Sequence, residues 1–245
     1  MPLVEVINLK KYFGKIRAVD GISFTIEEGE IFGLIGPNGA GKSTTLRILA
    51  TILKPTEGTA RIWHYDVVKD ADKVRKIISY LPEEAGAYAN LSGREYLEFM
   101  ARFWVVDKEQ LRKVVEEGIR IAGLGDRIND KTKTYSKGMK RRLLLARALM
   151  FQPKFAILDE PTSGLDVVHS LHVRKIIKDY AKNNGVTILV SSHNMLEVDF
   201  LCDRVALINK GKILDIGTPK ELKEKYDAEN LEEVFVKVMK NERRN

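Results

Sequence analysis

Residues 3–9 and 18–26 alternate apolar and polar side chains, whereas residues 31–36 form an unbroken apolar run. Alternation with a period of two is typical of a strand with one buried face, so the first two segments are predicted to be half-buried antiparallel strands. The continuous run, IFGLIG, indicates a strand covered on both faces, as in a parallel sheet. We therefore expect two kinds of β-structure near the N-terminus.

Apolar residues at helical spacing follow over residues 42–53, and the sequence KPTEG is expected to stop this helix. A short strand, TARIWHY, comes next. Residues 91–150 then have a mostly helical pattern, which opens on Ser92 as a possible N-cap with a glutamate three residues later. We predict a helical subdomain inserted at about 91–150.

Two further apolar runs, at residues 154–160 and 186–192, flank an amphipathic segment that ends at Gly185. A strand, a helix and a strand of this size predict a parallel crossover unit. Residues 204–217 indicate a hairpin, and residues 218–245 one or two short helices with a charged end. The fold class is therefore predicted to be α/β, with a mainly parallel sheet, an N-terminal antiparallel β subdomain and an inserted α-helical subdomain.

The composition is that of a folded protein, because 44% of the 245 residues are hydrophobic and 31% are charged. The formal net charge of +7 favours anionic partners, namely nucleotides, nucleic acid or an anionic membrane, without choosing among them. Cys202 is the only cysteine, which excludes an intramolecular disulfide and indicates a reducing, cytoplasmic compartment. We find no signal-peptide pattern and no run of about 18 apolar residues, so a link to a membrane is expected only through a partner.

The segment GPNGAGKS, Gly36 to Ser43, matches the pattern G-x-x-x-x-G-K-[ST] between a predicted buried strand and a predicted helix. Glycines let successive backbone N–H groups turn toward an anion, and the helix N-terminus adds a partial positive charge. Lys42 is expected to reach the outer phosphates of a nucleotide, and Ser43 to ligate Mg²⁺. The other predicted nucleotide-binding positions are Gly36, Asn38, Gly39, Ala40, Gly41 and Thr44.

An acidic pair, Asp159 and Glu160, ends the later apolar run FAILDE. Open parallel sheets place their binding residues at the carboxyl ends of strands. Taken alone, such a pair is usually the start of a solvated loop. Together with the phosphate-binding segment, we interpret Asp159 as holding Mg²⁺ through water and Glu160 as polarising the attacking water.

On these residues the chain resembles the nucleotide-binding subunit of an ATP-binding cassette (ABC) transporter, with the motifs in the family's order. GPNGAGKST is similar to the Walker A motif, FAILDE to Walker B, SGLD to the D-loop, and SSHNMLE to the switch-histidine segment. The resemblance implies a P-loop NTPase core that uses ATP and Mg²⁺. It covers residues 1–217 as one ABC ATPase domain and leaves residues 218–245 as a C-terminal helical tail.

The segment YSKGM, Tyr135 to Met139, resembles the family signature LSGGQ. Ser136 can cap a helix and Gly138 can expose backbone N–H groups at its start, which makes a second anion site. The resemblance implies that two cassettes pair head to tail, so that Ser136, Lys137 and Gly138 of one contact the nucleotide held by the other. Asp166 is the D-loop aspartate that links the two sites, and the basic residues at 140–142 are expected on the helix surface.

By the same resemblance His193 contacts the terminal phosphate and positions the water, and Phe13 stacks on adenine, with Tyr12 as the alternative. A histidine after a strand and an aromatic residue near a turn could instead be structural. Glu83 departs from the family's Q-loop glutamine. A carboxylate can still ligate Mg²⁺, so altered metal affinity or altered coupling is expected. Lys137 departs from a signature glycine and is expected to face solvent.

The resemblance implies an ATPase that works with a second cassette subunit, identical or related, and drives a transmembrane permease subunit docked near residues 85–103. It also implies a cytoplasmic location on the inner face of the cell membrane. The tail LEEVFVKVMK is similar to that of drug, antibiotic and lipid exporters, which favours export. The alternatives are a cassette ATPase acting on nucleic acid, whose coiled coil or second cassette this sequence lacks, and a small-molecule phosphotransferase, in which the signature and D-loop have no role. No nucleic-acid partner is expected.

Overall fold

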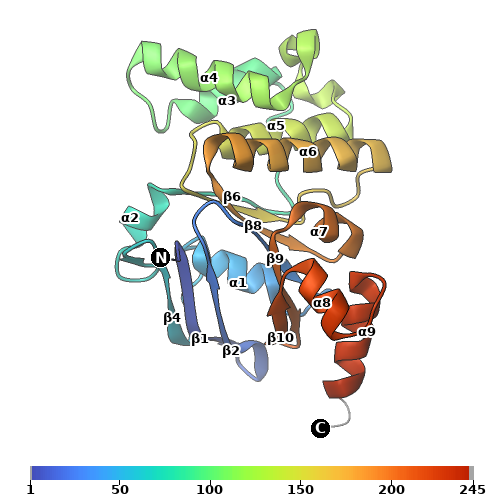
Figure 1. Cartoon of the computed structure of the whole chain (residues 1–245). Coiled ribbons are helices and arrows are strands. Elements are labelled where there is room, and N and C mark those ends of the chain that lie inside the picture. Colours follow the sequence, from blue (N-terminus) through green and yellow to red (C-terminus); the bar gives the residue numbers. More distant parts are fainter. Residues whose placement is uncertain (1, 243–245) are drawn as a thin grey trace.

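The protein is described here by a computed structural model, which covers residues 2–242 (Figure 1). A central sheet has the strand order β10-β9-β3-β8-β7-β6, in which only β10 is antiparallel to its neighbour. Its strands are β3 (Ile31–Ile35), β6 (Ile78–Leu81), β7 (Phe155–Asp159), β8 (Thr187–Ser192), β9 (Arg204–Asn209) and β10 (Lys212–Gly217). The central strands β3, β7 and β8 are buried along their whole length, as the continuous apolar runs predict.

A second, antiparallel sheet has the order β2-β1-β4-β5. Its strands are β1 (Val4–Phe13), β2 (Ile16–Ile26), β4 (Glu57–Ile62) and β5 (Tyr65–Asp66). Helix α1 (Lys42–Leu49) contributes Leu46, Ile48 and Leu49 to the core that joins the two sheets. The start of α1, where an anion is expected to bind, is thereby held between two rigid layers.

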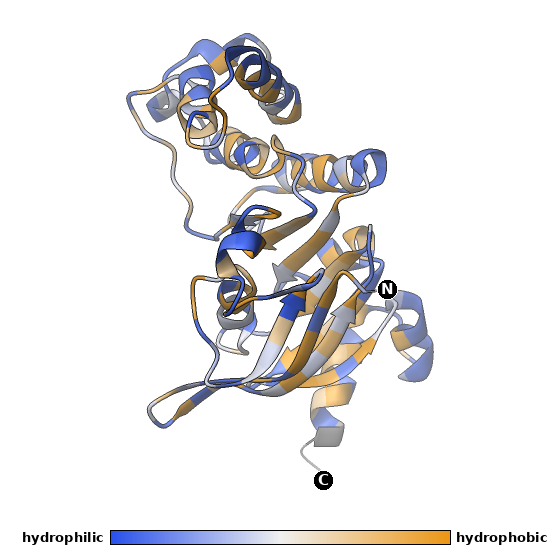
Figure 2. Cartoon of the chain, turned by 90° about the vertical axis from the view of Figure 1, so that its left-hand side faces the viewer, coloured by the Kyte–Doolittle hydropathy of each residue, from blue (hydrophilic) through white to orange (hydrophobic). Residues whose placement is uncertain are grey.

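The other face of the central sheet is covered by helices, which lie above it in Figure 1. They are α3 (Gly93–Ala101), α4 (Lys108–Ala122), α5 (Lys137–Leu149), α6 (Val167–Asn184) and α7 (Met195–Leu201), with 3₁₀ turns at Gly125–Asn129 and Thr132–Thr134. Two more helices, α8 (Pro219–Lys225) and α9 (Leu231–Glu242), lie at the opposite end of the molecule from α3 and α4 (Figure 1). Figure 2 shows that hydrophobic residues concentrate along the strands between these layers.

The predicted α/β fold with its two kinds of sheet is confirmed, and several element ends follow local chemistry. Ser92 caps α3 in a complete capping box with Glu95, and Gly185 ends α6 in the left-handed conformation with a φ of 63°. The helix expected over residues 42–53 is shorter, because it ends at Leu49. Helix α2 (Ala71–Arg75) and strand β6 are short elements that periodicity did not reveal. No helix among residues 2–242 is long and apolar enough to cross a membrane.

Candidate nucleotide-binding and catalytic site

The phosphate-binding loop connects the buried end of β3 to the first turn of α1. Only glycine fits at the two ends of this loop, because neighbouring backbone lies too close for a β-carbon. A β-carbon on Gly36 would lie 2.0 Å from the carbonyl oxygen of Ile208, and one on Gly41 would lie 2.4 Å from that of Ala18. Gly41 also has a φ of 109°. Between them, Gly39 faces open space and has a φ of 78°. Both ends of the loop are therefore fixed by neighbouring backbone.

Lys42 lies inside this loop rather than in solvent. Its ammonium donates to the carbonyl oxygen of Gly36 at 2.7 Å and lies 3.4 Å from Oε1 of Glu160. A cavity of about 370 Å³ opens beside it. The cavity is lined by Ile16, Arg17, Ala18, residues 37–44, Glu83 and Glu160. The predicted nucleotide-binding residues from Asn38 to Thr44 are thus brought together around one space.

Oxygen atoms suited to Mg²⁺ meet on one side of the loop. The hydroxyl of Ser43 donates to Oδ1 of Asp159 at 3.3 Å, and the hydroxyl of Ser191 donates to the same oxygen at 2.5 Å. Among the described residues no group of three or more His, Cys, Asp or Glu side chains could hold a metal alone. Mg²⁺ commonly uses one or two protein oxygens together with water and phosphate, so Ser43 and Asp159 fit that ion.

Glu83 also reaches this space. Its carboxylate lines the same cavity and accepts a hydrogen bond from the Oγ of Ser163, the first residue of the D-loop, at 3.1 Å. The structure thus places the carboxylate of Glu83 at the cavity wall. Glu83 is available as an oxygen ligand and at the same time connects two loops that are 80 residues apart.

Glu160 and His193 form a close pair. Nδ1 of His193 lies 2.8 Å from Oε2 of Glu160. Glu160 is only 5% exposed. The backbone N–H of Glu160 donates to Ser191 at both its carbonyl and its hydroxyl oxygen. Because Glu160 has a positive φ of 47°, the chain turns sharply after β7 and points the carboxylate toward Lys42. The two predicted catalytic side chains are therefore adjacent and face the phosphate loop.

Arg141 is a site residue that the sequence interpretation missed. The basic residues after the signature were expected on the helix surface, which is wrong for Arg141, because it is 7% exposed and its guanidinium donates five hydrogen bonds to carbonyl oxygens. The acceptors are Pro82, Glu83, Asp159, Glu160 and Pro161, at 2.7–3.2 Å. Burial lowers the pKa of Arg141, but a guanidinium remains charged. The only sequence signal for this burial is helical spacing. Arg141 lies four residues before Leu145, so both side chains fall on the buried face of α5.

The signature segment forms a second helix start. Ser136 caps α5 by accepting a hydrogen bond from the backbone N–H of Met139 at 3.2 Å. A β-carbon on Gly138 would come within 2.4 Å of the His169 ring, so the glycine lets α6 pack against this turn. Neither Ser136 nor Gly138 is among the residues that line the phosphate-loop cavity. The start of α5 is therefore separate from the phosphate-loop cavity within one chain.

Lys137 lies against the D-loop, the segment that ends at Asp166. Lys137 is exposed, but its ammonium lies against the backbone of Gly164, where a β-carbon would be 2.0 Å from Nζ. Asp166 caps α6 by accepting from the backbone N–H of His169 at 2.9 Å. The signature and the D-loop of one chain are thus in contact.

Phe13 ends β1 with its ring 48% exposed and is not among the residues that line the cavity. The hydroxyl of Tyr12 donates a hydrogen bond to Oδ1 of Asp20 at 2.6 Å. This bond contributes most to holding the pKa of Asp20 below its usual value. Phe13 is the more exposed of the two aromatic residues, and the Lys11 ammonium lies 5.0 Å from its ring centroid.

Comparisons with known proteins agree with this geometry. Residues 19–163 match the family model described as "ABC transporter". An uncharacterized ABC transporter ATP-binding protein, YhcH of Bacillus subtilis, is 41% identical over 89% of this chain and 71% of its own length. The daunorubicin/doxorubicin resistance ATP-binding protein DrrA of Streptomyces peucetius is 40% identical over 90% of this chain and 66% of its own length.

Among solved structures, the cbiO1 protein of Clostridium perfringens, part of the ABC transporter complex cbiONQ, superposes with a TM-score of 0.83 at 28% identity and covers 91% of each chain. A dimeric ATP-binding cassette, MJ0796, solved in a post-hydrolysis state with ADP and phosphate, superposes with a TM-score of 0.77 at 28% identity over 88% of this chain and 98% of that one. The chain belongs to the ABC transporter family, as one of its ATP-binding ATPase domains.

Proposed function

We propose that this chain closes head to tail on a second copy, or on a related subunit, around two ATP molecules, and that hydrolysis powers export through a separate transmembrane subunit. The observation that carries the proposal is the separation of the two anion-binding features. The phosphate loop has its own cavity, whereas Ser136 and Gly138 at the start of α5 lie outside it. A second chain supplies the missing half of each site.

The surface beside the D-loop supports this pairing. Val167 and Val168 follow Asp166 on the first turn of α6 and are 79% and 75% exposed. Adjacent apolar side chains on a surface indicate an interaction site. The start of α5 packs against the same turn of α6, through Gly138 and His169, and the helix dipole favours a phosphate there. Ser136, Lys137, Gly138 and Asp166 are the residues that we assign to the contact in trans.

We assign the chemical step to Glu160 and His193. Ser43 and Asp159 would hold Mg²⁺, with Glu83 as a further oxygen ligand, and the bound ion would neutralise phosphate charge. Lys42 contacts the outer phosphates. Glu160 accepts a hydrogen bond from the attacking water, and His193, 2.8 Å from it, holds that carboxylate and reaches toward the terminal phosphate. The adenine is assigned to Phe13.

An aromatic surface is the proposed contact with the membrane subunit. Tyr88, Phe99 and Phe103 form a chain of edge-to-face rings with centroids 5.5 and 5.2 Å apart, and each is exposed by more than 40%. Aromatic residues are enriched at protein interfaces. Docking there would hold the ATPase at the cytoplasmic face of the membrane. The export assignment draws on the resistance named for DrrA.

The decisive experiment traps the closed dimer. Glu160→Gln keeps the shape of the side chain but cannot take a proton from water, so bound ATP should persist and hold two chains together. We expect a monomer without nucleotide and a dimer with Mg²⁺ and ATP, measured by size-exclusion chromatography with light scattering. Adding Ser136→Asp to Glu160→Gln is the control, because an aspartate still caps α5 at this exposed position but its carboxylate repels phosphate. A Glu160→Gln protein that stays monomeric at saturating ATP contradicts the proposal.

A further inference from the structure

A buried glutamate lies close to the proposed catalytic residues. Glu197 is on the first turn of α7 and is 1% exposed. Glutamate is rarely buried to this extent unless a cation neutralises it. Glu30 shows the usual arrangement, because Nη1 of Arg204 lies 3.1 Å from its carboxylate. Glu197, in contrast, forms no ion pair with a cation among residues 2–242, and a hydroxyl group contacts it instead.

Glu197 closes a ring of hydrogen bonds around the turn that carries His193. The hydroxyl of Ser192 donates to Oε2 of Glu197 at 2.8 Å, and the same hydroxyl oxygen accepts from the backbone N–H of Asn194 at 3.0 Å. The backbone N–H of Glu197 in turn donates to Oδ1 of Asn194 at 3.3 Å. His193 lies between Ser192 and Asn194 in the sequence, so both residues that flank it are held.

This ring differs from an ordinary capping box. An N-cap side chain accepts from the third backbone N–H of the helix, and a glutamate at that third position usually accepts from the backbone N–H of the cap. Asn194 fills the first role, but the Ser192 hydroxyl stands between its N–H and the Glu197 carboxylate. The glutamate therefore holds the end of β8 as well as the start of α7.

The neighbours of the carboxylate also place it next to the loop that follows β7. Burial raises the pKa of Glu197, and the hydroxyl groups of Thr162 and Ser192 partly offset this rise. The negative charge of Glu160 raises the pKa further. The carboxylate thus lies where the chain leaves β7 and β8, between the two segments that supply Glu160 and His193.

His193 depends on a fixed backbone because its ring is only partly enclosed. Its side chain is 50% exposed and contacts Glu160 through Nδ1 at 2.8 Å. A displacement of about 1 Å at a reacting group can cost about a hundred-fold in rate. Since solvent surrounds half of the ring, its position is set by the turn between β8 and α7.

We propose that Glu197 is a positioning residue for ATP hydrolysis, which fixes the turn that holds His193 against Glu160. This role rests on the chemical role proposed for His193. Glu197 contacts neither the nucleotide nor the attacking water and acts only through the histidine. Its loss should therefore lower kcat and leave the KM for ATP unchanged, because the phosphate loop and Lys42 keep their contacts.

Two substitutions remove the contact from its two ends. Glu197→Ala removes the acceptor and Ser192→Ala removes the donor, and each should lower kcat about ten-fold or more with KM within about twofold. Combining them should lower kcat no further, because both act on one contact. Glu197→Gln keeps the volume and an oxygen that accepts from Ser192, so it should recover most of the rate. An additive loss in the combined variant would overturn the proposal.

A second double-mutant cycle tests whether Glu197 acts through His193. His193→Ala should lower kcat, and adding Glu197→Ala to it should cost nothing more. A further loss in the double variant would show that Glu197 acts elsewhere and overturn the proposal. Parental kcat in His193→Ala would overturn the chemical role proposed for the histidine, and this role with it. Parental kcat in Glu197→Ala beside an impaired His193→Ala would overturn the positioning role alone.

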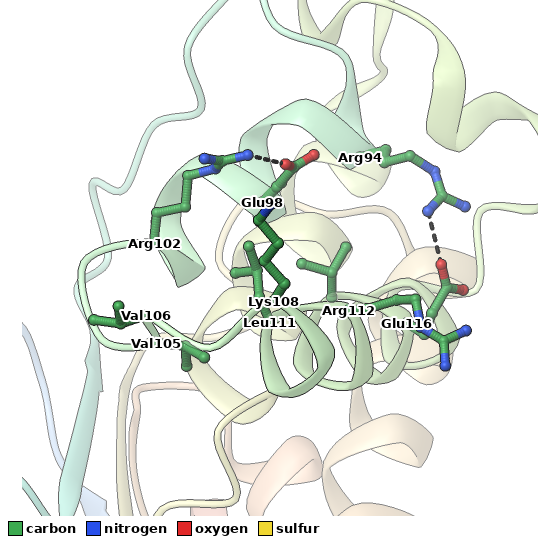
Figure 3. Close-up of a pocket in the computed structure, with 10 residues that line it drawn as sticks. Arg94, Glu98, Arg102, Val105, Val106, Lys108, Leu111, Arg112 and Glu116 are labelled. Carbon is green, nitrogen blue, oxygen red and sulfur yellow. Dashed lines mark hydrogen bonds and ion pairs between the residues drawn. The ribbon is translucent and has the colours of Figure 1, made fainter.

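Two other glutamates provide matched controls. Glu30 precedes β3, at the opposite end of that strand from the phosphate loop, so Glu30→Ala should unfold in less urea but keep the parental kcat. Glu116 lines a groove of about 570 Å³ between α3 and α4, where it pairs with Arg94 at 2.7 Å (Figure 3). Glu116→Ala should change neither property. If Glu30→Ala lowers kcat as much as Glu197→Ala does, the loss reports general destabilisation and the proposal is wrong.

Discussion

Replacing Arg141 tests whether the signature helix holds the catalytic segment in place. Arg141→Ala removes all five hydrogen bonds that the guanidinium donates to the ends of β6 and β7, and leaves those buried carbonyl oxygens without their donor. A net contribution of about 1 kcal/mol for each bond gives about 5 kcal/mol. Burying the guanidinium charge costs free energy and lowers the pKa of Arg141. The alanine variant no longer has this cost, which makes the expected loss of stability smaller. We therefore expect a loss of about 3–5 kcal/mol in the free energy of unfolding.

Turnover should fall as well, because one of the acceptors is the carbonyl oxygen of Glu160. A displacement of about 1 Å at a reacting group can cost about a hundred-fold in rate. Urea unfolding and steady-state ATPase assays measure the two effects on the same protein. Arg141→Lys should recover part of each, since an ammonium keeps the charge but not the planar fork. Lys140→Ala, one position earlier on α5, is the control and should leave both unchanged.

A free energy of unfolding for Arg141→Ala within about 0.5 kcal/mol of the parental value would refute this role, because that is the range expected of surface substitutions. It is also refuted if stability falls while kcat stays at the parental value. Such a result would mean that Arg141 supports the fold but does not position Glu160.

Two further predictions concern single carboxylates. Glu83→Gln removes a carboxylate from the cavity wall but keeps an acceptor for Ser163. The Mg²⁺ concentration that gives the half-maximal ATPase rate should therefore rise about fivefold or more. An unchanged Mg²⁺ titration contradicts a metal role for Glu83. Glu95 has its pKa lowered from 4.5 to about 2, first by the backbone N–H of Ser92 and then by Lys131. Its stabilising effect is therefore complete above about pH 4.5 and is lost as the pH falls toward 2. Glu95→Gln should unfold in less urea than the parent at pH 7, with the difference shrinking over that acid range; a pH-independent difference contradicts this account.

Much of the site follows from local backbone requirements, which a sequence carries directly. The loop from Gly36 to Ser43 is defined by glycines at fixed spacing between a buried strand and a helix, and the structure forms that loop. Ser92 and Ser136 cap helices because a serine hydroxyl reaches the third backbone N–H that follows it. Such features depend on a few consecutive residues.

Contacts between distant segments could not be predicted in this way. Arg141 has the composition of a helix surface, and it is buried only because the ends of β6 and β7 bring five carbonyl oxygens to one side of α5. Strand β6 itself has four residues, too few for periodicity to identify, and its place at the sheet edge is fixed by pairing with β7.

The sequence by itself therefore determined the nucleotide chemistry, because the phosphate loop, the Asp159–Glu160 pair and the helix caps are short patterns whose geometry is local. Only the tertiary structure decided which charges are buried and which are paired. Lys42 lies within hydrogen-bonding distance of the loop carbonyls, while Glu197 is buried without an ion pair among residues 2–242. The physical reason is that the environment of a charge depends on the groups that folding brings around it, and those groups come from distant parts of the chain.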